Sequence, residues 1–333
     1  MKNSVLLLCI QLSKKIIKLC IVKYTIKQEF SMQKNYVYVV TSSQEDFFAE
    51  MAAVSMKTLR LTNINSHIIV VCDKQTIHVE SPGVKLIKEL SNEIIAVKAP
   101  YDSSLVRSRY LKANLIKIIA KSFVYLDSDT LILKSLDSIW DNTVDIAATV
   151  DLTPKDTKNN TYSLAMQEAY QTMGWQFPPK RYLNSGVILI NDTQNVRELG
   201  NALATNWAEQ YQKTGKVNDQ YVFNHLINSM DLHVKLLPVF YNAQFIMEPL
   251  VAKNAAIVHV YSGQFDTRND TVLHILSKQL KRDGKIDDAT LIQMIKTKNP
   301  WTAMDSVKKY IALNDYVGAV AFMLKRLTKK IFR

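Results

Sequence analysis

Between residues 36 and 260, short apolar runs alternate with longer stretches in which apolar residues recur every three or four positions. Runs rich in β-branched and aromatic residues predict buried strands, and the wider spacing predicts helices. We predict strands at 36–40, 67–72, 123–127, 145–150, 186–190, 233–237 and 255–260, with a further candidate at 84–87. Helices are predicted at 47–61, 104–119, 194–212 and 218–228. This alternation indicates a largely parallel, doubly wound α/β sheet, which binds ligands at the carboxyl ends of its strands.

The two ends of the chain depart from this pattern. The apolar run at 5–10 is far shorter than the ~18 residues of a membrane span. Residues 1–31 therefore have three open interpretations: an amphipathic surface helix, a poor signal-like leader, or an extension upstream of a fold that begins near Met32. Residues 270–331 are predicted to be helical, either as a cap on the domain or as a membrane-surface helix. We divide the chain into a basic leader (1–31), an α/β domain (32–266) and a basic helical extension (267–333).

The charge of the protein is concentrated at these two ends. The net charge is +12, yet residues 1–35 hold seven lysines against one glutamate, and residues 302–333 hold seven basic against two acidic residues. The body between them is close to neutral. This distribution favours attraction to an anionic membrane surface and disfavours a nucleic-acid groove. A hydrophobic content of 47% excludes disorder, and three cysteines without metal-ligand spacing disfavour a disulfide scaffold or a zinc ribbon.

The strongest chemical signal is the segment YLDSDTLIL at 125–133, in which an apolar strand ends in Asp127 and Asp129. Two carboxylates this close repel each other unless a positive group lies between them. Carboxylate oxygens suit Mg²⁺ or Mn²⁺. His259 ends another predicted strand, AAIVH, that we expect to run beside the first one, so the three side chains predict a metal site. The competing interpretations are a solvated acidic turn and a core histidine.

Four segments resemble, in order and spacing, the family 8 retaining glycosyltransferases, the family of glycogenin and of the bacterial lipooligosaccharide galactosyltransferases. They are the strand, turn and helix at 36–59, the Asp-x-Asp region at 124–140, the Asn-x-Gly-Val strand at 181–191 and the Asp-Gln helix start at 217–224. The resemblance covers about 36–265. It implies a GT-A fold, a Rossmann-like mixed sheet flanked by helices, here with a helical C-terminal extension.

The resemblance also implies a role for each matching residue. Asp127, Asp129 and His259 would hold Mn²⁺ or Mg²⁺, and the metal would bridge the phosphates of a UDP-sugar donor. The remaining matches form a donor-binding set and a set around the transferred sugar. The donor set is Thr41 and Ser42 at the uridine, Ser128 towards the ribose, and Arg109 at the phosphate or sugar, with Arg107 and Lys112 as nearby substitutes. The sugar set is Asn184, Asp219 and Gln220.

The segment after His259 departs from the family pattern. A glycine is expected two positions after the histidine, and then a lysine that neutralises the β-phosphate. This chain has Gly263, two places later than that, followed by Gln264 and Phe265, and Arg268 is the available substitute. The departure motivates an alternative function, a protein without turnover that binds a glycan or a partner at a membrane. The retained carboxylates favour catalysis.

Other enzyme classes fit the sequence less well. A haloacid-dehalogenase-type phosphatase places its Asp-x-Asp near the start of the domain with a Gly-Thr after it, whereas here Asp129 lies some 90 residues into the domain and is followed by Thr130 and Leu131. GTP- or ATP-binding folds are disfavoured because the sequence has no Gly-rich loop ending in Lys-Ser/Thr. No further carboxylate pair suits double displacement, so a front-face transfer is favoured. We therefore predict a metal-dependent retaining transferase that moves glucose or galactose to a glycan, lipid-linked saccharide or protein acceptor at the cytoplasmic face of a membrane.

Overall fold

The computed structural model describes residues 33–152, 162–245, 248–261 and 271–331. The chain divides into two units, Met1–Lys34 and Asn35–Arg333, and the sheets and helices of the described residues belong to the second. The leader at 1–31 and the departures at Gly263, Gln264, Phe265 and Arg268 lie outside the described residues, so their predictions stay predictions.

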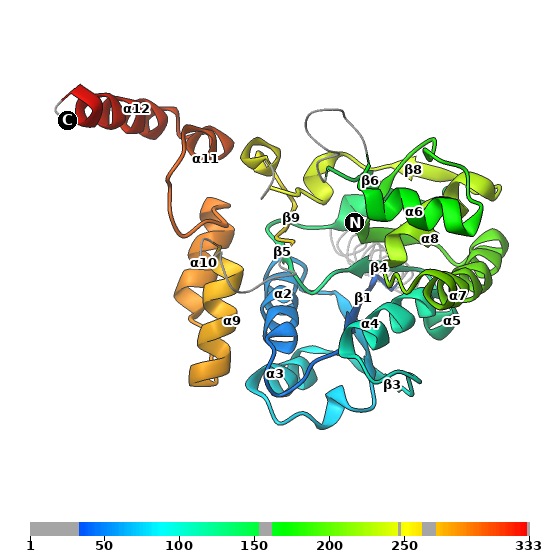
Figure 1. Cartoon of the computed structure of the whole chain (residues 1–333). Coiled ribbons are helices and arrows are strands. Elements are labelled where there is room, and N and C mark those ends of the chain that lie inside the picture. The colour runs from blue at the N-terminus through cyan, green and yellow to red at the C-terminus, as the bar shows by residue number, and fades with distance from the viewer. Residues whose placement is uncertain (1–32, 153–161, 246–247, 262–270, 332–333) are drawn as a thin grey trace, which may run out of the picture. The chain divides into compact units, whose positions relative to one another are not determined.

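A seven-stranded sheet with the order β3-β2-β1-β4-β7-β6-β8 forms the centre of the described fold (Figure 1). Strands β1 to β4 are mutually parallel where they pair, whereas β7 runs antiparallel to both β4 and β6, and β8 is parallel to β6. The sheet is therefore mixed, as the family resemblance implies. The strands are β1 (Asn35–Val40), β2 (His67–Asp73), β3 (Glu93–Val97), β4 (Phe123–Leu126), β6 (Ile146–Val150), β7 (Leu183–Ile190) and β8 (Val234–Leu236).

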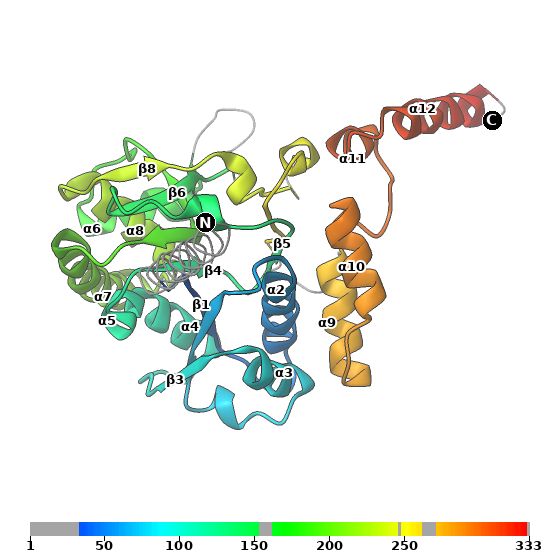
Figure 2. The same cartoon turned by 180° about the vertical axis from the view of Figure 1, so that it is seen from behind.

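Helices cover both faces of this sheet because its strands are apolar on both sides. Alternate side chains of a strand point to opposite faces, so Tyr36, Tyr38 and Val40 join the core under α2, α3 and α9, while Val37 and Val39 join the core under α4, α5, α7 and α8. Figure 2 shows α9 and α10 beside α2. The helices are α2 (Phe48–Thr62), α3 (Pro82–Leu90), α4 (Ser104–Ala113), α5 (Leu115–Ile119), α6 (Leu164–Met173), α7 (Gln194–Thr214), α8 (Asp219–Ser229), α9 (Val272–Asp283), α10 (Asp288–Thr297), α11 (Val307–Ala312) and α12 (Tyr316–Ile331).

Two of the predicted elements differ from the structure. The candidate strand at 84–87 is wrong, because these residues lie in α3, where Val84 and Ile87 turn one helical face towards the core. The Ser81 side chain accepts a hydrogen bond from the Val84 backbone N–H at 3.1 Å and so caps this helix. The edge strand is β3 instead. The helix predicted at 104–119 is interrupted at Asn114, which separates α4 from α5.

The histidine-bearing strand lies in a small second sheet. β5 (Thr130–Ile132) follows the Asp-x-Asp turn and pairs antiparallel with β9 (Ile257–His259), with Thr130 opposite His259. We expected the histidine strand beside the strand that carries the aspartates, and the structure pairs it with the strand directly after them. This ribbon brings His259 back onto the turn at 127–129.

Candidate active site

The Asp-x-Asp turn is clamped by the two strands beside it. The Asp127 backbone N–H donates to the Gly186 carbonyl of β7 at 2.8 Å, and the Val260 N–H donates to the Asp129 carbonyl at 2.9 Å. Within the turn, the Thr130 hydroxyl donates to the Asp127 carbonyl at 2.8 Å. Both aspartate side chains are thus presented from a backbone fixed on each side.

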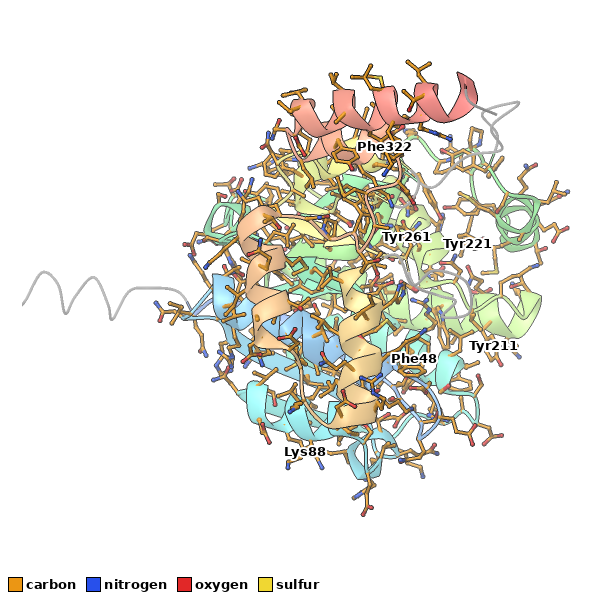
Figure 3. All side chains as sticks on the ribbon, turned by 90° about the vertical axis from the view of Figure 1, so that its left-hand side faces the viewer. Phe48, Lys88, Tyr211, Tyr221, Tyr261 and Phe322 are labelled. Carbon is orange, nitrogen blue, oxygen red and sulfur yellow. The ribbon has the colours of Figure 1, made fainter. Side chains whose placement is uncertain are left out.

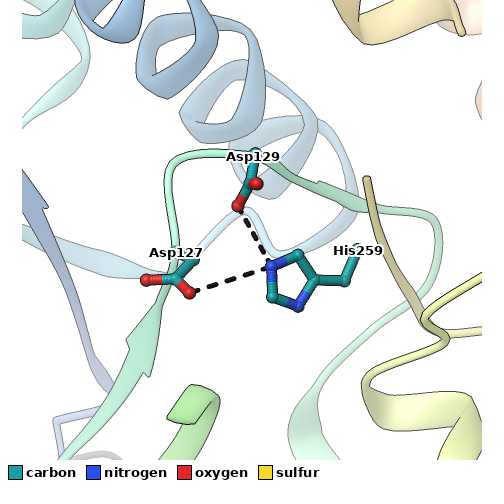
Figure 4. A group of neighbouring side chains, drawn as sticks. All are labelled: Asp127, Asp129 and His259. Atoms are coloured by element: carbon teal, nitrogen blue, oxygen red, sulfur yellow. Dashed lines mark ion pairs between the residues drawn. The ribbon is translucent and has the colours of Figure 1, made fainter. Parts of the chain in front are cut away.

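Asp127, Asp129 and His259 form a cluster that could bind a metal ion. Their ligand atoms all lie within 4.8 Å of one another. His259 Nε2 is 3.1 Å from Asp129 Oδ1 and 3.7 Å from Asp127 Oδ2 (Figure 4). The imidazole is 4% exposed, whereas the two carboxylates are 19% and 22% exposed. Two carboxylate oxygens and one imidazole nitrogen are a donor set that suits Mn²⁺ or Mg²⁺, and the exposed side leaves room for further oxygen ligands.

The carboxylates change the pKa of the histidine. Burial lowers the pKa of His259, but the charge of Asp129, its hydrogen bond to the ring, and the charge of Asp127 outweigh burial and raise the pKa above its usual 6.5. Without a metal, the imidazole therefore stays protonated to a higher pH than an ordinary histidine, and its positive charge offsets the two carboxylates. A metal ion that binds here replaces that proton.

A second charged cluster lies directly beside the first. Lys112 Nζ is 3.2 Å from Asp127 Oδ1 and 3.2 Å from Asp219 Oδ2, and it donates to the Ser185 hydroxyl at 3.2 Å. Arg109 Nη1 is 2.9 Å from Asp219 Oδ1. Burial raises the pKa of Asp219, yet Lys112 and Arg109 outweigh it and lower the pKa below its usual value. Lys112 thus neutralises two carboxylates, and Arg109, one third exposed, is the more accessible cation.

The residues predicted around the transferred sugar lie next to this cluster. Asn184 is the second residue of the buried strand β7. Asp219 and Gln220 are the first two residues of α8, which is capped by the Asn218 side chain. Gln220 Oε1 accepts from the Ser185 N–H at 2.9 Å and lies 3.3 Å from Asn184 Nδ2. The structure therefore brings all three predicted residues to one edge of the sheet.

The predicted nucleotide-side residues lie at the carboxyl end of β1. Thr41 and Ser42 follow the strand and are buried; the Thr41 hydroxyl donates to the Ser104 carbonyl at 3.1 Å, and Ser42 donates to Asp46. The Ser128 hydroxyl donates to the Val39 carbonyl at 3.3 Å, which places the Asp-x-Asp turn against the same strand end. Arg107 forms a buried ion pair with Asp73, with 2.6 Å between Nε and Oδ2, so its charge is already paired and it is a poor substitute for Arg109.

A comparison with protein-family models identifies the chain. The model described as Glycosyl transferase family 8 matches residues 22–266. The chain belongs to glycosyl transferase family 8. It is a glycosyltransferase with the α/β fold of that family, and the Asp-Asp-His cluster lies inside the matched region.

Solved structures similar to this family 8 chain include three glycosyltransferases. The galactosyltransferase LgtC, solved with donor and acceptor sugar analogs, is 16% identical, with 84% of this chain and 99% of that chain covered and a TM-score of 0.49. Mouse xyloside xylosyltransferase 1 is 13% identical (69% and 98% covered, TM-score 0.47). GlyE of Streptococcus pneumoniae TIGR4 is 16% identical (82% and 67% covered, TM-score 0.47). A search of curated proteins returns no match.

The structure of this family 8 site adds residues that the sequence did not single out. A Cβ placed on Gly186 would lie 2.3 Å from His259 Cε1 and 2.6 Å from Asp127 Oδ2, so only glycine fits beside the cluster. Asn242 Oδ1 is 2.9 Å from His259 Nδ1, and the Tyr261 ring stacks on the imidazole with 4.5 Å between centroids. Gly186 stands in a segment quoted for the resemblance, but no pattern in the sequence signalled Asn242 or Tyr261.

In the part of the chain that the structure describes, none of the helices combines the length and apolar character needed to cross a membrane.

Proposed function

We propose that this family 8 protein is a metal-dependent retaining hexosyltransferase that moves glucose or galactose from a UDP-sugar to a glycan, lipid-linked saccharide or protein acceptor. The observation that carries the proposal is the convergence of Asp127, Asp129 and His259 within 4.8 Å at the carboxyl end of β4. Open α/β sheets bind their ligands at this edge. Thr41, Ser42 and Ser128 lie at the adjacent strand end, in keeping with a uridine and ribose site there.

The charges of the site fit the departure of a diphosphate. A divalent ion held by Asp127, Asp129 and His259 supplies Lewis-acid stabilisation of the charge that develops on the leaving phosphate. Arg109, the more accessible cation, would bind the donor phosphate or sugar. Asn184 and Gln220, each fixed by hydrogen bonds to neighbouring backbone or side chains, would hold the transferred sugar by its hydroxyl groups.

The state of Asp219 favours front-face transfer with retention. A carboxylate nucleophile for double displacement attacks the anomeric carbon through the negative charge on its oxygens, which is weakened when cations bind them. Both oxygens of Asp219 are instead engaged, Oδ1 by Arg109 at 2.9 Å and Oδ2 by Lys112 at 3.2 Å and by the Ser185 hydroxyl at 3.1 Å. A carboxylate whose charge is paired with two cations is a weak nucleophile, which favours transfer without a covalent intermediate on Asp219.

The test is calorimetric titration with UDP in the presence and absence of Mn²⁺, followed by hydrolysis of a panel of UDP-sugars. We expect metal-dependent UDP binding and slow hydrolysis of one sugar. Asp127→Asn and Asp129→Asn should each abolish the metal-dependent part, whereas Asp141→Asn, which breaks a surface pair with Lys235, should not. UDP affinity that is unchanged in the first two variants would contradict the site. UDP binding without turnover of any sugar would favour the glycan- or partner-binding alternative.

We further propose that the extension at 267–333 attaches the domain at 32–266 to the cytoplasmic face of an anionic membrane. In α12, Val317, Val320, Leu324 and Leu327 recur at helical spacing and are each more than half exposed. The exposed cations Lys325 and Arg326 flank this stripe. Figure 3 shows the side chains of α12, Phe322 among them, projecting along the length of the helix. An apolar stripe with cationic flanks suits anionic headgroups.

Vesicle sedimentation tests this attachment. The protein should bind phosphatidylcholine vesicles that contain phosphatidylserine and bind pure phosphatidylcholine much less. Leu324→Asp together with Leu327→Asp should abolish binding, whereas Ile292→Asp on α10, another exposed apolar residue, should not. Sedimentation that is indifferent to phosphatidylserine or to these α12 changes would remove the membrane from the proposal.

A further inference from the structure

A chain of buried amide groups connects β7 to the metal-binding histidine. The Gly186 backbone N–H lies 2.9 Å from one terminal atom of the Asn184 side chain. Because a backbone N–H can only donate, that atom is the oxygen, Oδ1. The other terminal atom of Asn184 lies 3.3 Å from Gln220 Oε1, which already accepts from the Ser185 N–H, so it is the NH₂ group. Two backbone donors thus fix the orientation of the Asn184 amide.

The orientation of Asn184 determines that of Asn242. One side-chain atom of Asn242 lies 2.7 Å from Asn184 Oδ1, so it is the donor Nδ2. Asn242 Oδ1 is then the atom 2.9 Å from His259 Nδ1. An oxygen acceptor at this distance requires a hydrogen on Nδ1. Once a metal has displaced the second proton, the lone pair of the neutral imidazole is therefore on Nε2, the nitrogen that faces Asp129 at 3.1 Å and Asp127 at 3.7 Å.

The surroundings keep this arrangement dry and rigid. Asn184, Asn242 and His259 are all buried, so bulk water does not compete for their hydrogen bonds. Asn242 follows the short 3₁₀ helix η3 (Val239–Tyr241), and the next residue, Ala243, accepts from the His259 backbone N–H at 2.9 Å. The asparagine and the histidine are therefore fixed to each other through both backbone and side chain.

We propose that Asn242 is a positioning residue that holds His259 in its Nδ1–H tautomer and directs Nε2 to the metal between Asp127 and Asp129. The inference rests on the proposed metal-dependent function and assigns to it a residue outside the ligand set. Metal-bound histidines generally donate their second N–H to an acceptor that fixes the ring. Here the acceptor is itself held by Asn184, so the metal side and the sugar side of the site share one hydrogen-bonded chain.

The first measurement is a titration with Mn²⁺ alone, followed by electron paramagnetic resonance. Asn242→Ala removes the acceptor, and we expect Mn²⁺ affinity to fall by about 10–100-fold. Asn242→Asp keeps an acceptor for Nδ1–H but replaces the Nδ2 donor to Asn184 Oδ1 with an oxygen, and we expect it to lose clearly less Mn²⁺ affinity than Asn242→Ala. Asn191→Ala is the matched control, because Asn191 is a buried asparagine that donates to two backbone carbonyls directly after the opposite end of β7. It should leave Mn²⁺ affinity unchanged.

The second measurement reads the tautomer without any metal. In protein labelled with ¹⁵N-histidine, at a pH above the raised pKa of His259 where the ring is neutral, the ring should show the Nδ1–H pattern, assigned by its loss in His259→Gln. Asn242→Ala should convert part of this signal to Nε2–H, and Asn242→Asp should retain it. A merely structural role for Asn242 would change thermal stability without changing the tautomer.

The outcomes separate this inference from the function on which it rests. If the wild-type protein binds no Mn²⁺, the proposed metal-dependent function fails. If the wild-type protein binds Mn²⁺ and Asn242→Ala binds it equally well, only the role of Asn242 fails. Equal losses of affinity in Asn242→Ala and Asn242→Asp, or an Nε2–H tautomer in the wild-type protein, would likewise overturn that role. If Asn242→Ala does not fold, the aspartate variant and the wild-type tautomer still decide it.

Discussion

Replacement of Gly186 by alanine is the smallest change that tests the geometry of the metal cluster. The added methyl group would lie 2.3 Å from His259 Cε1, 2.6 Å from Asp127 Oδ2 and 2.9 Å from His259 Nδ1, whereas ordinary contact begins at 3.4 Å. The imidazole or the carboxylate therefore has to move by about 1 Å. Neither can move freely, because His259 is held by Asn242 and the Asp127 backbone N–H is bonded to the Gly186 carbonyl itself.

The expected loss follows from that displacement. A misplacement of about 1 Å in an active site lowers the reaction rate by roughly 100-fold. By the same reasoning we expect the Kd for Mn²⁺ to rise by about 10–100-fold, which corresponds to a loss of ~1.4–2.7 kcal/mol of binding free energy. Overpacking should also destabilise the fold by about 1–3 kcal/mol. The assay is Mn²⁺ titration followed by paramagnetic resonance, with thermal unfolding of the metal-free protein measured in parallel.

Gly200→Ala provides the matched control for overpacking. A Cβ on Gly200 would lie 2.7 Å from Ile116 Cγ2, where α7 packs on α5, and no residue of the metal cluster is among its nearest neighbours. This variant should lose stability and keep its Mn²⁺ affinity. The reasoning is refuted if Gly186→Ala binds Mn²⁺ as the wild-type protein does, or if both variants lose affinity in proportion to their loss of stability.

Two further predictions concern the charges of the site. Lys112→Met leaves the carboxylates of Asp127 and Asp219 without the cation between them, so we expect the metal-free protein to lose about 3 kcal/mol of unfolding free energy. The variant should also gain more thermal stability from Mn²⁺ than the wild-type protein gains. An unchanged melting temperature of the metal-free variant would contradict this. The raised pKa of His259 means that, between pH 6.5 and that pKa, the metal-free ring still holds a proton that Mn²⁺ must displace. Mn²⁺ affinity should therefore increase with pH in this range, with one proton released per ion bound, and level off above the folded-state pKa. An Mn²⁺ affinity that is flat from pH 6 to 8 would argue against the histidine as a ligand.

The order of strands and helices could largely be predicted because the apolar periods are local properties of the chain. The exceptions have local causes too. Val84 and Ile87 satisfy both a short strand and one face of a helix, and the choice was made by the Ser81 cap and by packing against α2. The interruption at Asn114 divides one continuous helical pattern into two helices, and the apolar spacing on either side of it gave no sign of the break.

The residues of the candidate site likewise fall into those that the sequence could identify and those that only the structure could. Asp127, Asp129 and His259 could be named from residue type and strand position, because charged groups at strand ends are visible in a sequence. Asn242 could not, because an amide acquires its role only through the distance to its partners. Gly186 likewise has a meaning for the site only once His259 has been brought back beside it by the pairing of β5 with β9.

The pairing of β5 with β9 also means that the Asp-Asp-His cluster can form only late in the synthesis of the chain. Asp129 and His259 are about 130 positions apart, and at the usual 5–20 residues per second a ribosome needs on the order of ten seconds to cover that distance. Throughout this interval a growing chain carries the two carboxylates without the imidazole that completes the cluster. Chains that are released before His259 is made therefore lack the complete Asp-Asp-His cluster.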